Sequence, residues 1–163
     1  MGRFISDATR IKEGRGIGSL DKYTPWIKVF DLSSSGISWR IEGKKTGRIH
    51  HLLSTLEKKV FLFYDNNPAV IDIREQYPLD LNRTIEISIN LNLSHIKYED
   101  KHIHMTTDFL IDFEDKQVAI SVKPKSKLTK CAIKKFQIEY NYWKSLNVRF
   151  YLYTEIEIAK LDL

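Results

Sequence analysis

The residues of this chain best suited to chemistry are Asp108 and Lys123, which lie on two neighbouring segments of alternating apolar and polar side chains. The segments 107–113 and 118–123 are separated by polar residues, a pattern typical of two strands in a hairpin. A two-residue turn at 114–115 would bring both residues to one face of the hairpin, a diagonal step apart. A carboxylate there can hold a divalent cation and an ammonium can handle the attacking water, so the pair suits metal-assisted hydrolysis of a phosphodiester.

The same turn places Ser121 directly opposite Asp108. The order of Asp108, Ser121 and Lys123 resembles the loose Asp-x(n)-(Asp/Glu)-x-Lys signature of the PD-(D/E)xK nuclease superfamily, with Ser121 in the second acidic position. We expect the other face of the hairpin, with Phe109 and Ile120, to be the apolar one. An Asp and a Lys on neighbouring strands also commonly form a half-exposed ion pair, so the pattern alone leaves both interpretations open.

A further carboxylate, Glu57, lies in a segment with helical periodicity. Apolar residues recur at three- and four-residue intervals from 48 to 64 and predict one amphipathic helix over that range. Glu57 falls at the margin of the apolar stripe, whereas Lys58 and Lys59 point away from it. Glu57 could therefore join Asp108 at a metal site, or it could be a boundary residue whose carboxylate reaches water.

The order of the expected elements predicts an α/β fold. The helix at 48–64 is followed by a strand at 70–76, an ambiguous segment at 84–97, the hairpin, a helix at 129–146 and a strand at 148–153. This αβββαβ order with a mixed central sheet resembles the core of restriction-endonuclease-like proteins. We therefore expect a nuclease-like core over 48–163 and an irregular, glycine-punctuated N-terminal extension over 1–47 that packs on it.

The helix at 129–146 contains the one acidic residue of a basic segment, Glu139. Glu139 could approach a metal, but an ion pair with Lys135 four residues earlier is the preferred interpretation. The apolar face expected to be buried consists of Ile133, Phe136, Tyr140 and Trp143.

Charge is distributed unevenly along the chain. Residues 51–115 carry 6 basic and 12 acidic side chains, whereas residues 116–149 carry 9 basic and 1 acidic. This distribution suits a polyanion laid over a metal site, because lysines meet phosphates while carboxylates concentrate the cation. A solvated basic helix would give the same pattern, so the charge supports DNA binding without establishing it.

Length and composition limit the class of protein. A chain of 163 residues with 42% hydrophobic residues fits a single domain. The one cysteine, Cys131, excludes an internal disulfide and a cysteine-based zinc site. The sequence shows neither an apolar run long enough to span a bilayer nor a signal-peptide apolar region, so we expect a bacterial, cytoplasmic protein without membrane contact.

Long ordered strings of residues identify the chain as a member of the TnsA family, the endonuclease subunits of heteromeric transposases in Tn-seven-like elements. The matching strings run almost from end to end and lie at 10–16, 23–26, 34–36, 45–57, 72–79, 107–110, 122–124 and 142–143. They include Asp72-Ile73-Arg74-Glu75-Gln76-x-Pro78-Leu79 and Thr107-Asp108-Phe109-Leu110. The resemblance is more specific than the nuclease signature alone.

The resemblance implies that Glu57, Asp108 and Lys123 are catalytic. The metal, Mg²⁺ with Mn²⁺ as the alternative, would be held by Glu57, Asp108 and the backbone carbonyl of Val122. In the family the position two before the lysine is a Gln or an acid. Here it is Ser121, a weaker ligand, which puts a second metal in doubt.

The resemblance also implies a reaction and partners. The family cuts the 5′ ends of the transposon in double-stranded DNA, while a DDE-type transposase subunit, TnsB, acts on the 3′ ends. The family's C-terminal domain, which contacts the ATP-dependent regulator TnsC, is absent from these residues, so contacts with TnsC are not assumed. Candidate phosphate contacts are Lys45, Arg48, Lys125 and Lys127.

Two other functions stay open. Ser121 favours a non-catalytic assembly module that keeps the nuclease fold and bridges partners on DNA. A stand-alone PD-(D/E)xK nuclease is the other, and it predicts cleavage by the purified chain without a partner.

Overall fold

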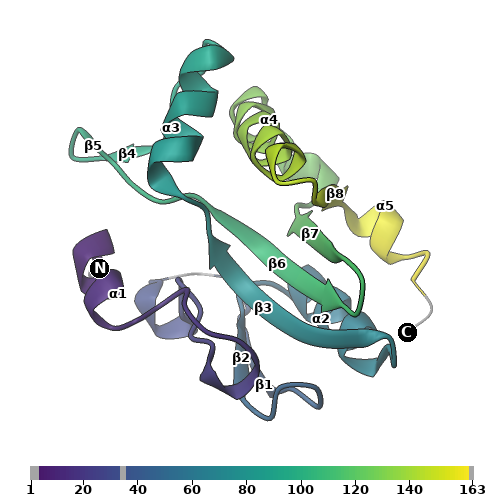
Figure 1. The fold of residues 1–163 in the computed structure, drawn as a ribbon. Helices are drawn as coiled ribbons and strands as arrows, with labels where there is room; N and C mark the ends of the chain where they lie inside the picture. Colours follow the sequence, from purple (N-terminus) through teal and green to yellow (C-terminus); the bar gives the residue numbers. More distant parts are fainter. Residues whose placement is uncertain (1–3, 34–35, 162–163) are drawn as a thin grey trace.

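A four-stranded mixed sheet with the strand order β3-β6-β7-β8 forms the centre of the protein (Figure 1). The computed structural model describes residues 4–33 and 36–161. The strands of this sheet are β3 (Val70–Pro78), β6 (Thr106–Phe113), β7 (Gln117–Val122) and β8 (Arg149–Tyr153). β6 runs antiparallel to its two neighbours β3 and β7, and β8 runs parallel to β7, which a helix connects to it.

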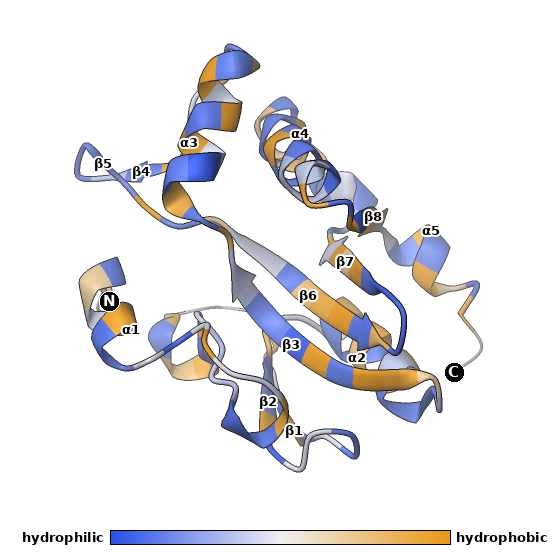
Figure 2. Ribbon diagram, in the orientation of Figure 1, coloured by the Kyte–Doolittle hydropathy of each residue, from blue (hydrophilic) through white to orange (hydrophobic). Residues whose placement is uncertain are grey.

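Helices cover both faces of the sheet (Figure 1). The helices α2 (Thr55–Asn66) and α5 (Glu155–Ile158) pack on one face, and α3 (Leu81–Asn90) and α4 (Lys130–Ser145) lie over the other. Apolar and polar residues alternate along β3 and around both α3 and α4, as Figure 2 shows. The expected apolar face of the hairpin is confirmed, because Phe109 and Ile120 pack toward α2. The opposite face is partly apolar as well, since Leu110 and Ala119 are buried toward α4.

The remaining elements are short. Near the N-terminus lie α1 (Asp7–Lys12), two 3₁₀ helices (Leu20–Lys22 and Val29–Asp31) and the hairpin of β1 (Trp39–Glu42) with β2 (Ile49–Leu52). A small hairpin of β4 (Lys97–Tyr98) and β5 (Lys101–His102) precedes β6, and a 3₁₀ helix (Lys125–Lys127) follows β7. None of the helices in the described ranges is long and apolar enough to cross a membrane.

The α/β fold with a mixed sheet and the restriction-endonuclease-like order of core elements are confirmed, with α3 inserted between β3 and β6. The hairpin register is also confirmed, because Phe109 pairs with Ile120 and Asp112 with Gln117. The same register extended by one residue places Asp108 opposite Ser121.

The start of the first core helix was predicted wrongly. Residues 49–52 form β2, and α2 begins only at Thr55. The hydroxyl of Ser54 accepts a hydrogen bond from the backbone N–H of Glu57 at 3.1 Å and so caps the helix. The apolar side chains before Ser54 continue the helical stripe by chance while they pair with β1 as a strand.

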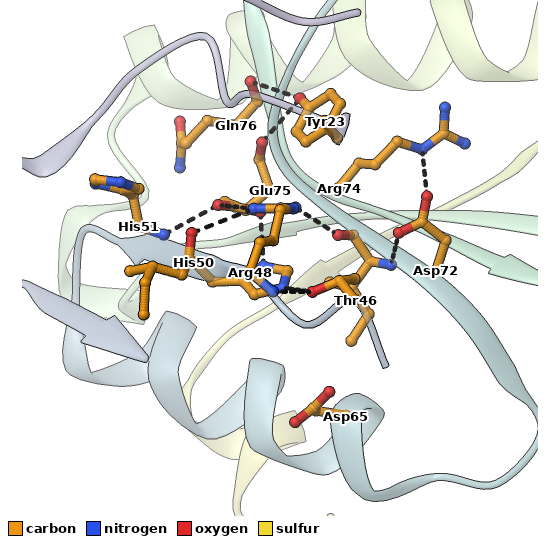
Figure 3. Close-up of polar contacts among 12 residues, drawn as sticks. Tyr23, Thr46, Arg48, His50, His51, Asp65, Asp72, Arg74, Glu75 and Gln76 are labelled. Carbon is orange, nitrogen blue, oxygen red and sulfur yellow. Dashed lines mark hydrogen bonds and ion pairs between the residues drawn. The ribbon is translucent and has the colours of Figure 1, made fainter. Parts of the chain in front are cut away.

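The carboxylate of Glu75 joins β2 and the turn before it to β3 (Figure 3). It accepts hydrogen bonds from Arg48 at 2.9 and 2.7 Å, from His50 Nδ1 at 2.8 Å and from the backbone N–H of His51 at 3.0 Å. Arg48 also donates to the carbonyl of Ile73 at 2.9 Å. Glu75 and His50 are fully buried. The fully buried carboxylate thus has four donors, and each of them fixes the N-terminal part of the chain against β3.

The contacts of Glu75 make its carboxyl more acidic than that of an ordinary glutamate. Burial would raise its pKa, but the hydrogen bonds from His50 and Arg48 outweigh burial and lower the pKa to about 2, from an ordinary value of 4.5. A carboxyl whose pKa is lower in the folded state stabilises the fold above its ordinary pKa. It loses that contribution as the pH falls toward the folded value. The contribution of Glu75 is therefore complete at neutral pH and is lost between about pH 4.5 and pH 2.

Replacing Glu75 tests this arrangement. We expect Glu75→Gln to lower the free energy of unfolding by roughly 3–5 kcal/mol at pH 7, because it leaves the buried guanidinium of Arg48 without its counter-charge. Urea titrations from pH 7 down to pH 2.5 should show this difference shrinking below about pH 4.5. The exposed Glu86→Gln is the matched control, with an expected change within about 0.5 kcal/mol. A pH-independent difference would contradict the low pKa of Glu75.

Candidate active site

The structure brings Glu57 and Asp108 together through the side-chain amide of Gln76. The amide nitrogen of Gln76 lies 3.4 Å from Glu57 Oε2 and 3.3 Å from Asp108 Oδ1. Glu57 comes from α2 and Asp108 from β6, so the two residues are far apart in sequence. One small donor therefore spans the gap between the two carboxylates that sequence reasoning proposed as metal ligands.

Glu57 is fixed by the first turn of α2. Its carboxylate accepts hydrogen bonds from the backbone N–H of Leu53 at 2.9 Å and from the hydroxyl of Ser54 at 3.0 Å. These contacts resemble a capping box, in which a serine side chain accepts the backbone N–H of a glutamate three residues later. The glutamate side chain in turn accepts a backbone N–H at the start of the helix. Glu57 is only 6% exposed, so it does not reach bulk water as a boundary residue would.

Asp108 is fixed by the neighbouring strand. The backbone N–H of Val122 donates to Asp108 Oδ2 at 2.6 Å, which orients the carboxylate along the edge of the hairpin. Val122 thus acts on the site through its amide hydrogen. The expected role of its carbonyl as a metal ligand stays a prediction. Lys123 follows immediately, is half-buried, and its charge favours the ionised form of Asp108.

The two carboxyls have abnormal acidities. Burial, and then the charge of Asp108, raises the pKa of Glu57 to about 8. Burial also raises the pKa of Asp108, although the Val122 N–H bond opposes the shift. Two carboxylates that share a buried site cannot both ionise readily without added positive charge. The protein alone therefore holds a proton in this pair at neutral pH, and a bound cation could replace that proton.

Gln76 has the backbone geometry of a special position. Its φ is +47°, in the left-handed region that a residue with a side chain rarely adopts, and the side chain is buried. Its carbonyl accepts the backbone N–H of Trp26 at 3.1 Å, and the side-chain oxygen accepts the hydroxyl of Thr106 at 3.4 Å. Sequence reasoning missed Gln76, because nothing in its type or spacing predicts that its amide meets both acids.

Ser121 faces an acid from α4 in place of a metal ligand. Its hydroxyl donates to Glu139 at 3.0 and 3.1 Å, and the hydroxyl of Thr107 donates to the same carboxylate at 3.2 Å. Glu139 is fully buried, and burial raises its pKa to about 7. Within the described residues Glu139 forms no ion pair with Lys135, so the preferred interpretation of Glu139 is wrong.

The face of α4 that carries Glu139 also differs from the expectation. The buried residues are Ile138, Glu139, Tyr142 and Trp143, whereas Ile133 and Tyr140 are about half exposed. The indole of Trp143 donates to Thr107 and so supports the contacts of Glu139. Spacing was the available signal, because Glu139 precedes Tyr142 by three residues and Trp143 by four, which places all three on one side of a helix.

These acids do not form a ready-made cluster. Across residues 4–33 and 36–161, no group of three or more His, Cys, Asp or Glu side chains is arranged to hold a metal ion. A cation at Glu57 and Asp108 would thus have two carboxylates and would complete its coordination with other oxygens, such as water or backbone carbonyls.

The four candidate DNA contacts lie in different places. The side chains of Lys125 and Lys127 are exposed on the 3₁₀ helix that follows Lys123. Lys45 lies near Asp65, which accepts its backbone N–H at 3.1 Å. Asp65 and Glu57 are at opposite ends of α2. The backbone of Lys45, which contacts Asp65, therefore lies roughly 12 Å from Glu57 along the helix axis.

Arg48 is the candidate that the structure argues against. Its guanidinium contacts Glu75, the carbonyl of Ile73 and the carbonyl of Leu20, and its side chain is only 9% exposed. Few donors remain for a phosphate, and breaking the contact with buried Glu75 would be costly. We therefore correct its role from a phosphate contact to the fixing of the N-terminal segment on β3.

Comparison with known proteins points to one family. Residues 67–155 match the family model described as TnsA-like endonuclease N terminal, a range that contains Asp108 and Lys123. The chain is also 43% identical over 158 residues to the Transposon Tn7 transposition protein TnsA of Escherichia coli. That alignment covers 94% of this chain and 58% of the relative, so the chain spans little more than half of the relative's length.

The shared donor can be tested by removing it. We expect Gln76→Ala to lower the free energy of unfolding by about 1–3 kcal/mol, because the buried carboxylate of Glu57 and the half-buried one of Asp108 both lose a hydrogen-bond donor. The effect should be largest at pH 8.5, where more of the pair is ionised, and smallest at pH 5. Chemical denaturation at both values measures it, with the exposed Gln137→Ala as the control. Equal stability of Gln76→Ala and wild type at pH 8.5 would remove Gln76 from the site.

Proposed function

The chain belongs to the TnsA-like endonuclease family, and from this we propose that it is the DNA-cutting subunit of a transposase. The proposed reaction is Mg²⁺-dependent hydrolysis of the phosphodiester at the 5′ ends of a transposon. The observation that carries the proposal is the approach of Glu57 and Asp108 to one donor, with Lys123 beside Asp108. These are the residues onto which the family's catalytic acids and lysine fall.

The chemistry of the donor set fits a hard divalent cation. Carboxylate oxygens are the preferred protein ligands of Mg²⁺, and Mn²⁺ accepts the same oxygens. Loss of hydration raises the pKa values of buried Glu57 and half-buried Asp108, and the charge of Asp108 raises that of Glu57 further, so a positive charge between them would stabilise their ionised forms. We propose that Glu57 and Asp108 hold the cation, with the Val122 carbonyl as a further candidate ligand.

Each residue of the site has a distinct part in the proposed reaction. A bound cation would supply charge neutralisation at the scissile phosphate and activation of a water molecule. Asp108 keeps its orientation through the Val122 N–H, and Glu57 keeps its own through Leu53 and Ser54. Lys123 would stabilise negative charge as it develops on the phosphate oxygens or position the attacking water.

The proposal includes a place of action and partners. The substrate is double-stranded DNA at transposon ends in the cytoplasm of a bacterium, and the partner is the DDE-type transposase subunit TnsB, which would act on the 3′ ends. The relative from Escherichia coli is named as a transposition protein, which supports this setting. Placement of the cut by a partner would also explain why the sequence has no recognisable base-reading helix motif.

One observation favours a different function, that of a non-catalytic assembly module. Ser121 replaces the Gln or acid of the family, and its hydroxyl is turned to Glu139 and not to Asp108. A module of this kind would not cut DNA at all. Mutations at Asp108 and Lys123 would then change neither cleavage nor assembly on DNA.

Asp108→Asn tests the cleavage assignment. The substitution keeps the size of the side chain but removes its charge, so we expect single-turnover cutting of the 5′ strand to fall at least about 100-fold. DNA affinity should be unchanged or higher, because a negative charge near the phosphates is lost. The assay uses end-containing DNA with Mg²⁺ and TnsB, and the exposed Asp115→Asn is the control.

The outcomes separate the three functions. Loss of cutting in Asp108→Asn alone supports the proposal. Wild-type cutting without TnsB would indicate a stand-alone nuclease, and assembly with TnsB on DNA without any 5′ cutting would indicate the assembly module.

Lys123 and Lys125 make a second comparison, because they are two residues apart but only Lys123 is next to Asp108. Lys123→Ala should lower the cleavage rate by about 100-fold or more with nearly unchanged DNA affinity, since its role is local. Lys125→Ala should weaken DNA binding slightly, with a smaller salt dependence, and leave the rate of the bound complex intact. Equal effects on rate from the two substitutions would reduce Lys123 to one part of a basic surface.

A further inference from the structure

A cavity of about 860 Å³ opens beside the candidate active site. Its walls are the first half of α4, the segment after β7 and residues on both sides of the β4–β5 hairpin. Lys123 lines it, so the cavity and the carboxylate pair share a residue. Its volume lies within the range of pockets that hold small organic ligands, roughly 300–1,000 Å³.

The charge of this cavity has one sign. Its lining contains the five lysines Lys123, Lys127, Lys130, Lys134 and Lys135, and among the described lining residues there is no Asp or Glu. None of the five forms an ion pair with a carboxylate in the ranges that the structure describes. The charges of Lys135 and Lys123 act on Asp108, and that of Lys135 also acts on Glu139, but no carboxylate of the described residues contacts the lysines directly. Lysines gathered in this way attract an anion, and phosphate is the anion of the proposed substrate.

The cavity also has an apolar side. Met105 and Ile138 form part of its wall and are each 1% exposed, while Phe136 and Ile96 are partly exposed toward it. A site for phosphate alone needs no such surface. Aromatic and aliphatic side chains do bind the faces of nucleobases, by stacking and by burial of apolar area.

The position of the cavity restricts which nucleotide could enter. Lys123 lines the cavity and its charge also acts on Asp108, so a phosphate on the lysines would be near the phosphate that is cut. A base within an intact duplex is stacked and paired and cannot reach an apolar wall. It must leave the stack first, as in other enzymes that extrude a nucleotide.

We propose that this cavity binds one unstacked nucleotide of the cut strand, adjacent to the scissile phosphate. The lysines take its phosphate, and Phe136 with the neighbouring apolar residues takes its base. The proposal rests on the function proposed above, since it assumes a DNA substrate. It adds a requirement for local opening of the duplex at the cut.

Binding measurements in EDTA test the cavity without cleavage. The probes are two fluorescent duplexes with the same transposon end, one fully paired and one with a single mismatch next to the cut. Because a mismatched base is easier to unstack, we expect the wild-type chain with TnsB to bind the mismatched duplex at least about 10-fold more tightly than the paired one. Fluorescence anisotropy at fixed salt gives both affinities.

Variants separate the two parts of the cavity. Phe136→Ala should abolish the preference for the mismatch, whereas Phe136→Trp, which keeps an aromatic surface, should retain it. The double variant Lys130→Ala with Lys134→Ala should weaken binding to both duplexes and leave the preference. Tyr140→Ala, an exposed aromatic of the same helix outside the cavity, is the control, and thermal melting verifies that each variant is folded.

The results discriminate this proposal from the proposed function. Equal binding of the two duplexes by wild type, or an undiminished preference in folded Phe136→Ala, would overturn the nucleotide site. If Phe136→Ala does not fold, Phe136→Gln, which replaces the apolar ring with a polar side chain, decides: loss of the preference supports the proposal and its persistence overturns it. Cleavage with Mg²⁺ without any preference for the mismatched duplex would support the proposed endonuclease function and reject the nucleotide site in this cavity.

Discussion

The buried carboxylate of Glu75 is the contact on which the arrangement of this protein depends. Arg48, His50 and the backbone of His51 all donate to it, and these contacts fix β2 and the preceding turn on β3. The next residue along β3 is Gln76, whose left-handed backbone turns its amide toward both candidate acids. The contacts of Glu75 thus fix the strand beside Gln76, and Gln76 in turn contacts both acids.

The candidate site gathers carboxyl groups whose ionised forms are electrostatically unfavourable. Buried Glu57 and half-buried Asp108 lie near each other, and the neutral amide of Gln76 is a weak substitute for positive charge. Glu139, buried behind Ser121, adds a third acid with a raised pKa. Folding alone gains nothing from such a collection of carboxyls. A cation and a phosphate, together with the lysines beside the site, would relieve it, and this is the physical argument for a metal-dependent reaction on DNA.

Local patterns predicted much of this structure. Alternation and a two-residue turn fix the hairpin register, so Asp108 opposite Ser121 followed from the sequence. The helix start was missed although Ser54 and Glu57 have the spacing of a capping box, because the apolar stripe continued through β2. Helical spacing could have placed Glu139 on the buried face of α4, but neither its partner Ser121 nor the role of Gln76 could be assigned, since those contacts join residues more than 15 positions apart. Long-range contacts of polar residues leave no periodic signal.

The most direct test of the central claim, that Glu57 and Asp108 form one cation site, is a crystal structure of the protein with Mn²⁺, located by its anomalous scattering. The account predicts a Mn²⁺ ion between the two carboxylates, with the amide nitrogen of Gln76 displaced from its position between them. Asp108→Asn grown in the same conditions should show no ion there. Mn²⁺ bound only elsewhere, or an unchanged Gln76 amide between the two acids at saturating Mn²⁺, would contradict the account.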